Sequence, residues 1–387
     1  MSIFWFKRWV RLWPASTGEY RRVRRRPESV AAKNRPRLEM LEDRMVPTFL
    51  AATTFAVGDG PLSVAVADFN RNKTLDLAVA RSGSDDVFTL LGDGKGAFGN
   101  FASNAAGDLP ISVAVGDFNK DKRPDVAAAN LMGDTVSILL GNGSGAFQAA
   151  QNFAVGDGPF SVAVADFNKD KKQDLAVANQ SSDNVSILLG NGDGSFQAAQ
   201  NFAAGDLPRS VVVGDFNKDK RKDLAVASRN TDSVLVLLGN GDGTFQAGQN
   251  FGVGDSPQSV VVGDFNKDKI QDLAAANFGS DNVSLLLGNG NGTFQAAQNF
   301  AAGDGAIFVA VGDFDKDKRL DLVVANFEAD TVSLHLGNGN GTLQAAVNFA
   351  VGNGPRFVGA RDFNKDKMLD LMVGNEFGDS LSVLLNA

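Results

Sequence analysis

The chain has 387 residues and a formal net charge of −8, with one histidine and no cysteine. The missing cysteine excludes thiol catalysis and zinc–thiolate sites, and it fits a cytosolic protein or an exported one without disulfides. The acidic balance argues against a nucleic-acid partner, which needs a basic protein face. No apolar run reaches the roughly 18–20 residues of a membrane span.

The first 48 residues differ from the rest in composition. They hold 12 Lys/Arg and 5 Asp/Glu, a net of +7, which leaves 25 and 40, a net of −15, from the whole-chain totals of 37 and 45. Trp5, Trp9 and Trp13 would share one side of a short helix, a pattern suited to contact with a membrane surface. We expect 1–48 to be a basic targeting or leader segment, disordered or processed, ahead of a folded body at 49–387. The alternative is a disordered basic leader that no receptor reads.

The body is a sevenfold repeat. Strings such as VVGDFNKDKIQDL, from Val261 to Leu273, recur every 49 residues without insertion or deletion. A constant period of this length indicates stacked supersecondary units. The first aspartates of the seven strings are Asp68, Asp117, Asp166, Asp215, Asp264, Asp313 and Asp362.

Each repeat contains four predicted strands, which the unit at 159–205 illustrates. In chain order they are SVAVADF (161–167), DLAVAN (174–179), NVSILLG (184–190) and FQAAQNFAAG (196–205). β-Branched residues fill the strands, and Gly, Asn and Asp punctuate the connections. Alanine on one face and valine on the other indicate sheets buried on both sides. The Asn-Gly and Asp-Gly steps of GNGDGSF predict a tight hairpin between the third and fourth strands.

The two ends of the body supply complementary parts of one repeat. TTFAVGDGP (53–61) is a fourth strand with no third strand before it, and SLSVLLNA (380–387) is a third strand with no fourth strand after it. Joining them completes the seventh unit and removes the open sheet edges. The predicted fold is all-β: a seven-bladed β-propeller of 49-residue four-stranded repeats, closed by an N-terminal strand.

The loop between the first and second strands, which we call the aspartate loop, carries oxygen donors at positions 1, 3, 5 and 9. Alternate residues of a tight loop can face one centre, and hard oxygen donors in this number suit Ca2+ better than a transition metal. Without a cation, carboxylates this close would repel one another. The predicted metal ligands are Asp68, Asn70, Asn72, Asp76, Asp117, Asn119, Asp121, Asp125, Asp166, Asn168, Asp170, Asp174, Asp215, Asn217, Asp219, Asp223, Asp264, Asn266, Asp268, Asp272, Asp313, Asp315, Asp317, Asp321, Asp362, Asn364, Asp366 and Asp370.

Basic residues in the same loops blunt the attraction for Ca2+. Lysine or arginine occupies position 4, and position 6 is always lysine, although a positive φ at position 6 favours glycine. We therefore expect up to seven weak sites, with dissociation constants on the order of 10⁻⁴ to 10⁻³ M. Repeat 1 is the poorest, because Asn72 replaces an aspartate, and repeat 6 is the richest, because Asp315 replaces an asparagine. The alternative is an Asx-rich turn without metal. The position-6 lysines are Lys73, Lys122, Lys171, Lys220, Lys269, Lys318 and Lys367.

The strand–DFNKDKxxDL–strand unit, followed by LLGNGDGTF and NFAVGDGP, resembles the FG-GAP/VCBS repeat in all seven units. The resemblance implies a seven-bladed propeller like the head of integrin α chains, with calcium in the aspartate loops. Such repeats also occur in bacterial surface proteins, in lectin-like propellers and in accessory domains of some hydrolases and lyases. The lysine at position 6 departs from the glycine common in that family.

A second resemblance concerns the string RPRLEMLEDRMVPTF at 35–49. It is similar to a short motif that precedes repeat domains in some bacterial exported proteins. The resemblance implies a secreted or cell-surface location.

Antiparallel strands divide the loops between two faces. The aspartate loops and the glycine hairpins between third and fourth strands share one face, which we call the aspartate face. The opposite face, the variable face, carries the connections between second and third strands and those between repeats. Aromatic and arginine residues there are typical interface anchors, and the alternative is drift in unconstrained loops. The candidate ligand residues are Phe160, Arg209, Arg229, Phe278, Ile307, Phe327, Arg356 and Phe377.

No motif in the repeats predicts catalysis. His335 replaces a leucine of a third strand and lacks the positioned partners that a general base needs. We predict a non-catalytic, calcium-stabilised binding or adhesion module, secreted or at the cell surface, whose ligand is a protein or a carbohydrate. The alternatives are an enzyme or accessory domain that acts on polysaccharide, and a purely structural surface component.

Overall fold

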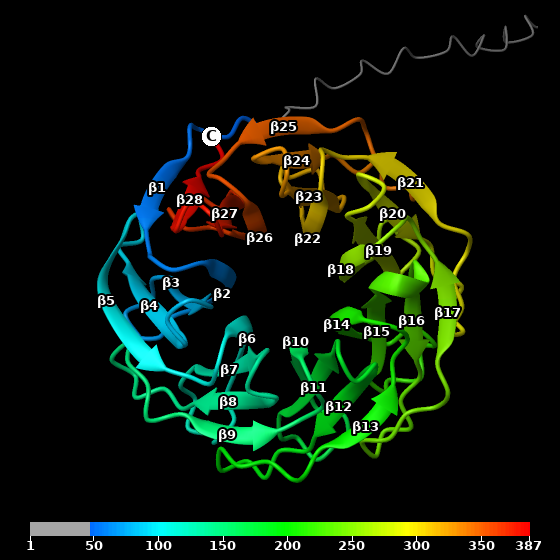
Figure 1. Ribbon diagram of the computed structural model, residues 1–387. Coiled ribbons are helices and arrows are strands. Elements are labelled where there is room, and N and C mark those ends of the chain that lie inside the picture. Colours follow the sequence, from blue (N-terminus) through cyan, green and yellow to red (C-terminus); the bar gives the residue numbers. More distant parts are fainter. Residues whose placement is uncertain (1–46) are drawn as a thin grey trace, which may run out of the picture. The chain divides into compact units, whose positions relative to one another are not determined.

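The computed structural model describes residues 47–387, without the side chains of residues 100 and 101. These residues form seven four-stranded antiparallel sheets, arranged as blades around a central axis (Figure 1). The predicted seven-bladed β-propeller is confirmed. The predicted leader segment lies outside the described residues apart from Pro47 and Thr48. Within 47–387, no helix is long and apolar enough to cross a membrane.

Within the first six blades the strands follow one another outward from the axis in chain order, and the seventh blade takes its outermost strand from the N-terminal end of the body. The first four blades contain β2 (Pro61–Ala67), β3 (Asp76–Arg81), β4 (Asp86–Gly92) and β5 (Phe98–Ala105); β6 (Pro110–Gly116), β7 (Asp125–Asn130), β8 (Thr135–Leu139) and β9 (Gln151–Ala154); β10 (Pro159–Ala165), β11 (Asp174–Asn179), β12 (Asn184–Leu188) and β13 (Gln200–Ala203); and β14 (Pro208–Gly214), β15 (Asp223–Ser228), β16 (Ser233–Leu237) and β17 (Gln249–Gly252). The last three contain β18 (Pro257–Gly263), β19 (Asp272–Asn277), β20 (Asn282–Leu286) and β21 (Gln298–Ala301); β22 (Ala306–Gly312), β23 (Asp321–Asn326), β24 (Thr331–His335) and β25 (Val347–Ala350); and β26 (Pro355–Arg361), β27 (Asp370–Asn375) and β28 (Ser380–Leu384) with β1 (Thr53–Ala56). A 3-10 turn, η1 (Arg229–Thr231), follows β15.

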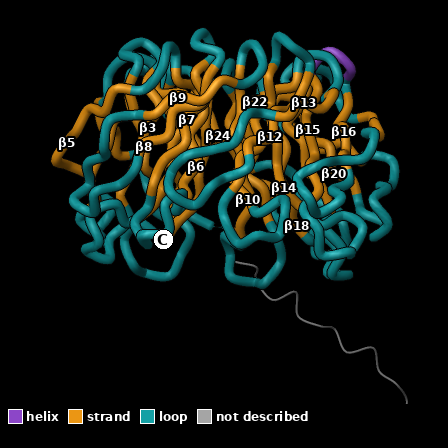
Figure 2. The backbone as a smooth tube through the Cα atoms, turned by 90° about the horizontal axis from the view of Figure 1, so that it is seen from below, coloured by secondary structure: helices purple, strands orange, loops and turns teal. Residues whose placement is uncertain are grey.

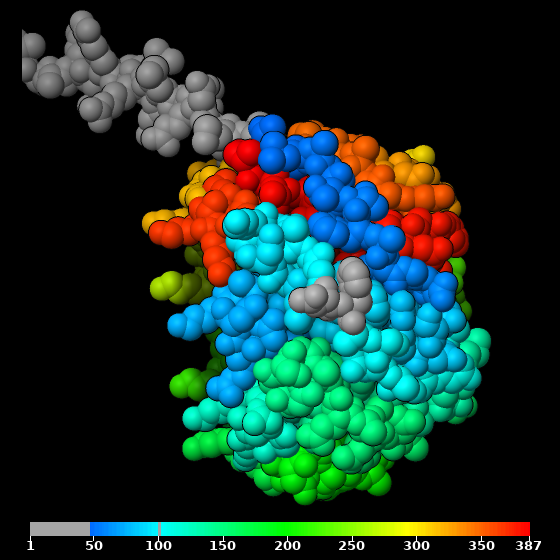
Figure 3. Space-filling view, turned by 90° about the vertical axis from the view of Figure 1, so that its left-hand side faces the viewer, coloured from blue at the N-terminus to red at the C-terminus, as the bar shows by residue number. Residues whose placement is uncertain are grey.

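The ring closes through β1, as the sequence predicts. β1 pairs with β28 from Thr53 opposite Val383 to Ala56 opposite Ser380. A further bridge joins Phe49 to Asn386. In the space-filling view the blue N-terminal strand lies directly over the red C-terminal strands (Figure 3). The joint leaves no blade with an unpaired fourth position, so the propeller has no open end.

Alternation of small and large residues in each second strand locks neighbouring blades together. In β11, Ala176 shares a buried cluster with Leu224 of the next blade. On the opposite face of β11, Leu175 packs with Ala127 of the preceding blade. All four side chains are fully buried. Burial of each large aliphatic side chain contributes roughly 1.5–3 kcal/mol to folding stability, so the contacts between neighbouring blades stabilise the ring.

Each innermost strand begins with a β-bulge. In β10, Pro159 pairs with Asn179 and Ser161 with Ala178, so Phe160 is the extra residue. The same shift occurs in β2, β6, β14, β18, β22 and β26. A bulge re-aims the side chain of its extra residue. The ring therefore presents one re-aimed side chain per blade at equivalent positions of the innermost strands.

Hydrogen bonds on the variable face hold the turn that precedes each bulge. Asp183, in the turn between β11 and β12, accepts the Leu207 N–H through Oδ1 at 2.9 Å. Asp379 accepts the Gly60 N–H in the same way at 2.9 Å, which extends the pattern across the ring closure. These contacts fix the backbone from which the bulge side chains project.

Candidate functional site

The predicted division of the loops between two faces is observed. In the edge view, loops lie along both rims and the strands lie between them, with the 3-10 turn on one rim (Figure 2). On the aspartate face, the Gly194 N–H of a glycine hairpin donates to Phe118 O in the aspartate loop of the preceding blade at 3.0 Å. On the variable face, the Gln180 N–H donates to Gly158 O at 2.9 Å, joining the two kinds of connection there.

The aspartate loop of blade 2 is a set of nested Asx turns. Asp117 accepts the N–H of Asp121 through Oδ1 and that of Lys122 through Oδ2, both at 3.0 Å. Asn119 Oδ1 accepts the Asp121 N–H at 3.0 Å, and Asp121 Oδ1 accepts the Arg123 N–H at 2.8 Å. The side chains at positions 1, 3 and 5 therefore gather around one turn of backbone, and N–H dipoles offset part of their negative charge.

Positive φ angles occur at two positions of this loop rather than one. In blade 2, φ is 60° at Lys120 and 62° at Lys122, and the other six loops repeat both values within a few degrees. The expectation for position 6 is confirmed, and position 4 adds a second left-handed residue. Each costs a non-glycine residue roughly 1–2 kcal/mol, which the side-chain-to-backbone hydrogen bonds of the loop offset.

The ninth-position aspartate has a structural contact that the sequence analysis missed. Asp125 is fully buried; its Oδ2 accepts the Phe118 N–H at 2.8 Å and its Oδ1 accepts the Gly141 N–H at 2.7 Å. The carboxylate therefore ties its loop to the end of the third strand. Burial raises the pKa of Asp125 to about 6, against the lowering effect of these hydrogen bonds. The pKa of Asp272 is likewise raised by burial to about 6.

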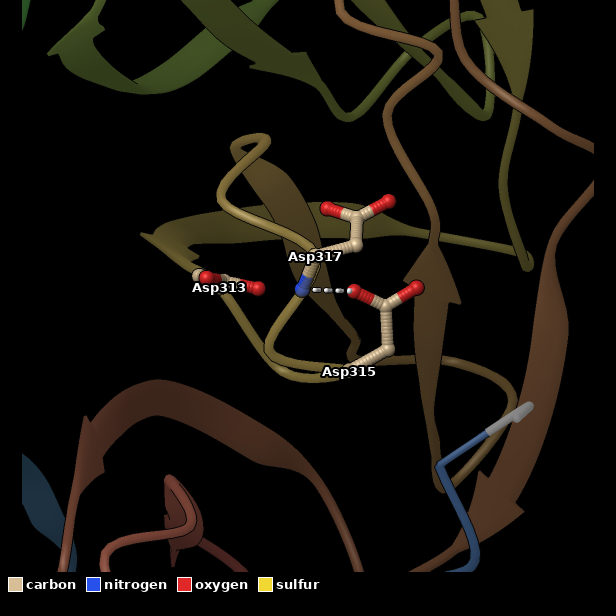
Figure 4. Close-up of side chains that lie close together, drawn as sticks. All are labelled: Asp313, Asp315 and Asp317. Atoms are coloured by element: carbon tan, nitrogen blue, oxygen red, sulfur yellow. Dashed lines mark hydrogen bonds between the residues drawn. The ribbon is translucent and has the colours of Figure 1, made fainter. Parts of the chain in front are cut away.

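Blade 6 gathers three carboxylates. Asp313, Asp315 and Asp317 each offer an oxygen, and these oxygens lie within 4.8 Å of one another (Figure 4). The Asp317 N–H donates to Asp315 Oδ1 at 3.1 Å, and the Lys318 N–H donates to Asp313 Oδ2 at 2.9 Å. Asp313 Oδ1 is buried and has no hydrogen-bond partner among the described residues. In the other loops an asparagine occupies position 3.

These donors fit a hard divalent cation best in blade 6, where the charge of three carboxylates converges on one point. At positions 1, 3 and 5, the loops of blades 2 to 5 and 7 have one carboxylate fewer, and the loop of blade 1 has two fewer. The metal-ligand role of all predicted donors remains a prediction. At the ninth position, both carboxylate oxygens accept hydrogen bonds from backbone N–H groups, as in Asp174 and Asp223.

On the variable face, all seven bulge residues line one central cavity of about 300 Å³. Its apolar lining comes mainly from blades 1 to 3, with Leu62, Ile111 and Phe160 as bulge residues. Blades 4 and 7 contribute Arg209 and Arg356. Four of the predicted ligand-face residues are thus brought together: Phe160, Arg209, Ile307 and Arg356. The remaining bulge residues are Leu62, Ile111 and Gln258.

The two arginines of the cavity have different surroundings. The Arg209 guanidinium lies over the Phe160 ring, 4.3 Å from its centroid. Burial lowers the pKa of Arg209 to about 10, with smaller contributions from the positive charges of Arg229 and Arg356. Arg356 forms an ion pair with Glu376 at 3.7 Å, between Nη1 and Oε2. Burial is also the largest cause that lowers the pKa of Arg356.

The structure shows which residue of blade 7 corresponds to Phe327 in the connection between the second and third strands. Phe327 N donates to Gly305 O at 2.9 Å, and in blade 7 the equivalent donor is Glu376 N, to Gly354 O, at 2.8 Å. Glu376, rather than Phe377, is therefore the counterpart of Phe327. Glu376 lines the cavity and was missed, although the 49-residue period applied to Phe327 leads to it directly.

The predicted aromatic residues form a row outside the cavity. Phe278 and Phe327 have ring centroids 6.5 Å apart, and Phe327 and Phe377 are 5.3 Å apart. Phe377 is 64% exposed. Arg356 lies 5.5 Å from the Phe327 centroid, so the row reaches the edge of the cavity. Arg229 begins η1 nearby and contributes positive charge to both cavity arginines.

His335 is a buried strand residue. It ends β24, is 1% exposed, and its Nδ1 lies 3.2 Å from Gln344 O. Burial lowers its pKa, which favours the neutral ring. Its Nε2 is buried without a hydrogen-bond partner among the described residues. The side chain therefore has no access to a substrate in this conformation.

Comparison with protein families identifies the repeat. The FG-GAP-like repeat model matches six overlapping stretches, at residues 68–128, 117–177, 166–226, 215–275, 264–324 and 313–373. The chain belongs to the FG-GAP-like repeat family. Each matched stretch begins at the first aspartate of a loop, so the aspartate loop is part of what defines this FG-GAP-like propeller. A search of curated protein sequences found no match.

Solved structures with low sequence identity share the propeller fold. BBS1N, crystallised in complex with ARL6DN, is 13% identical with a TM-score of 0.62, over 88% of this chain and 97% of that chain. Virginiamycin B lyase from Staphylococcus aureus is 9% identical with a TM-score of 0.62, over 87% and 99%. An Agrocybe aegerita lectin that recognises non-reducing terminal N-acetylglucosamine is 17% identical with a TM-score of 0.56, over 88% and 96%. At these identities the likeness concerns the fold alone.

Proposed function

We propose that this FG-GAP-like propeller is a non-catalytic binding module, secreted or displayed at the cell surface, which recognises a protein or carbohydrate with its variable face. The observation that carries the proposal is the convergence of seven bulge side chains, of five residue types, on one cavity. Uniform backbone with divergent side chains is the arrangement expected of a recognition surface on a rigid scaffold. The row of Phe278, Phe327 and Phe377 extends that surface with apolar anchors.

The proposal includes calcium in the aspartate loops, most strongly in blade 6. Asp313, Asp315 and Asp317 would supply the carboxylate oxygens, and bound Ca2+ would neutralise their mutual repulsion and stiffen the loop. Weak affinity suits a calcium-rich exterior, and the basic segment 1–48 would serve as the address for export. The lectin among the similar structures and the protein-bound BBS1N indicate that this fold can serve either ligand class.

An array experiment tests the proposed binding function. The full chain is applied to glycan and peptide arrays, in parallel with Phe160→Ala on the variable face and Lys171→Ala on the aspartate face of the same blade. We expect array ligands whose signal Phe160→Ala removes and Lys171→Ala preserves. Ligands lost equally in both variants, or retained in both, would contradict recognition by the variable face. Turnover of an array saccharide by the full chain would replace the proposal with the enzyme alternative.

A further inference from the structure

The cavity of the variable face contains a positive charge that the described residues do not neutralise. The Arg209 side chain extends from the start of β14 and has no carboxylate partner within 47–387, and its buried Nε has no hydrogen-bond partner there. The Phe160 ring face is its nearest favourable contact, at 4.3 Å from the centroid. Arg209 is half-buried, and a guanidinium whose Nε is shielded from water without a hydrogen-bond acceptor is only partly compensated by the contact with Phe160.

The fold does not require this charge. Bulge positions share one backbone conformation, yet they hold Leu62 in blade 1, Ile111 in blade 2 and Gln258 in blade 5. A neutral residue at position 209 would therefore fit the same bulge. An arginine that is dispensable for the backbone and lacks an internal partner is available to a ligand.

A second arginine faces the same cavity with a partial partner. Arg356 is paired with Glu376, but the 3.7 Å separation of their nearest atoms is longer than a charge-assisted hydrogen bond, and Glu376 Oε2 has no hydrogen-bond partner among the described residues. Among the residues that line the cavity, Arg209 and Arg356 stand against Glu376 alone, so the lining carries an excess of positive charge. The guanidinium groups can offer several N–H donors to one anion.

The remaining lining fixes what else such an anion must carry. Leu62, Leu109, Ile111 and Leu131 form an apolar wall across blades 1 and 2, alongside three serines of the same blades, and Phe160 continues it to Arg209. The cavity volume of about 300 Å³ lies at the lower end of small-molecule sites. A bare inorganic anion would leave the apolar wall in contact with water, whereas a compact apolar group beside the anion would bury it.

The charge of the whole body limits the ligand to few negative charges. Residues 49–387 carry a net of −15, from 25 Lys/Arg and 40 Asp/Glu. A polyanion would be repelled over most of its length, whereas a single carboxylate inside the cavity experiences mainly the nearby arginines.

We propose that the cavity binds an organic monoanion, a carboxylate on a compact apolar body, with Arg209 as its main counter-ion and Arg356 as a second donor. The carboxylate accepts N–H groups from the guanidinium fork, and the apolar body packs against the wall of blades 1 to 3. The proposal rests on the proposed function in one respect, namely that the variable face is the recognition face, and it names the chemistry that this face selects. A free small acid and the C-terminal carboxylate of a peptide with an apolar last residue share that chemistry.

Calorimetric titration of the full chain tests the proposal with defined probes: 3-phenylpropanoate, its neutral amide, acetate, and a tetrapeptide that ends in phenylalanine with a free carboxylate. We expect 3-phenylpropanoate to bind, and the amide and acetate to bind at least about tenfold more weakly. Added NaCl should weaken the binding of 3-phenylpropanoate but not that of the amide. Tighter binding of the tetrapeptide identifies a peptide C-terminus as the source, and tighter binding of the free acid identifies a small metabolite.

Arg209→Gln is the matched variant, because it installs the residue that Gln258 provides in blade 5. We expect it to weaken 3-phenylpropanoate at least about tenfold with an unchanged melting temperature. Arg221→Gln, the same charge change on the aspartate face of blade 4, should leave the affinity unchanged. Equal affinity for acid and amide, unchanged affinity in Arg209→Gln, or no binding of any probe at millimolar concentration overturns the proposal.

The outcome separates this proposal from the wider binding function. If array ligands depend on Phe160 while no carboxylate probe binds, the variable face recognises a ligand of other chemistry and only the carboxylate proposal fails. If 3-phenylpropanoate binds through Arg209 while no array ligand is found, the carboxylate site stands and the macromolecular binding function fails.

Discussion

The two faces of the propeller use the same seven backbones in opposite ways. On the aspartate face, all seven loops repeat the same pair of positive φ angles, as Lys120 and Lys122 illustrate, and six of them repeat the same side-chain-to-backbone hydrogen bonds. On the variable face, the seven bulges repeat the backbone, but their side chains range from Leu62 to Arg209. Uniformity of side chains marks a structural role, and diversity on a uniform backbone marks a recognition role.

The largest expected effect concerns the aspartate face. Asp174→Ala removes the carboxylate that accepts the N–H groups of Phe167 and Gly190, each at 2.8 Å. Two buried donors are left unpaired, so we expect a loss of about 2–6 kcal/mol of unfolding free energy. Urea denaturation of the full chain measures it. The control Asp170→Ala removes an exposed carboxylate of the same loop and should cost about 1 kcal/mol or less. Equal effects of the two variants would contradict the structural role of position 9.

The pH dependence of stability sharpens the same contrast. The folded-state pKa values of Asp125 and Asp272 are raised to about 6, above the ordinary 3.8. Between these values the folded state binds more protons than the unfolded state, so stability increases as the pH falls from 7 to 5. We expect about 1 kcal/mol from each carboxyl over this interval, read from melting temperatures. The double variant Asp125→Asn with Asp272→Asn should show a smaller rise in melting temperature. A melting temperature of the unmodified chain that falls steadily from pH 7 to 5 would contradict the raised pKa values.

Much of this comparison could be predicted from the sequence. The 49-residue period predicts the blades. The two partial repeats at the ends of the body, with strands at Thr53 and Leu384, predict the ring closure. The period also places the seven bulge positions one above another in the alignment. The side-chain identities at Phe160, Arg209 and Arg356 therefore predicted that these residues share one face, without showing that they meet in a single cavity.

Other features depend on three-dimensional contacts that the pattern does not contain. The sequence predicts Asp125 as a fourth oxygen donor. Its burial beneath the loop and its hydrogen bond with the Gly141 N–H follow only from the packing of the third strand. The positive φ at Lys120 could not be predicted, because the position holds no glycine. Glu376 is different, because the 49-residue period leads from Phe327 directly to it, and only the more conspicuous aromatic neighbour Phe377 hides it in the sequence.

Calcium tests whether the aspartate loops differ among themselves. With dissociation constants on the order of 10⁻⁴ to 10⁻³ M, 2 mM Ca2+ should add roughly 0.6–1.8 kcal/mol per occupied site over EGTA. We expect the combined change of Asp313, Asp315 and Asp317 to Asn in blade 6 to remove the largest share of the rise in melting temperature. The matched control changes Asp117 and Asp121 to Asn in blade 2. An identical melting temperature in Ca2+ and EGTA would support the metal-free Asx turn.

The smallest expected effect is at the sixth loop position. Lys220 has a φ of 62°, which glycine adopts without strain. We expect Lys220→Gly to raise the unfolding free energy by about 0.5–1 kcal/mol, after subtraction of the added flexibility of the unfolded chain. Lys220→Ala keeps the strain and serves as the control in urea denaturation. Destabilisation by glycine relative to alanine would show that the left-handed backbone is not a cost at this position.

The most direct test of the division between faces uses the absence of cysteine from the chain. Single cysteines are introduced in blade 5, as Gln258→Cys in the cavity and Lys269→Cys on the aspartate face, and each is labelled with a maleimide-linked polyethylene glycol. Binding of an array-selected ligand is then measured with and without the label. The account predicts that the label at 258 abolishes binding and that the label at 269 leaves it unchanged. Loss of binding with the label at 269 and retention at 258 would contradict it.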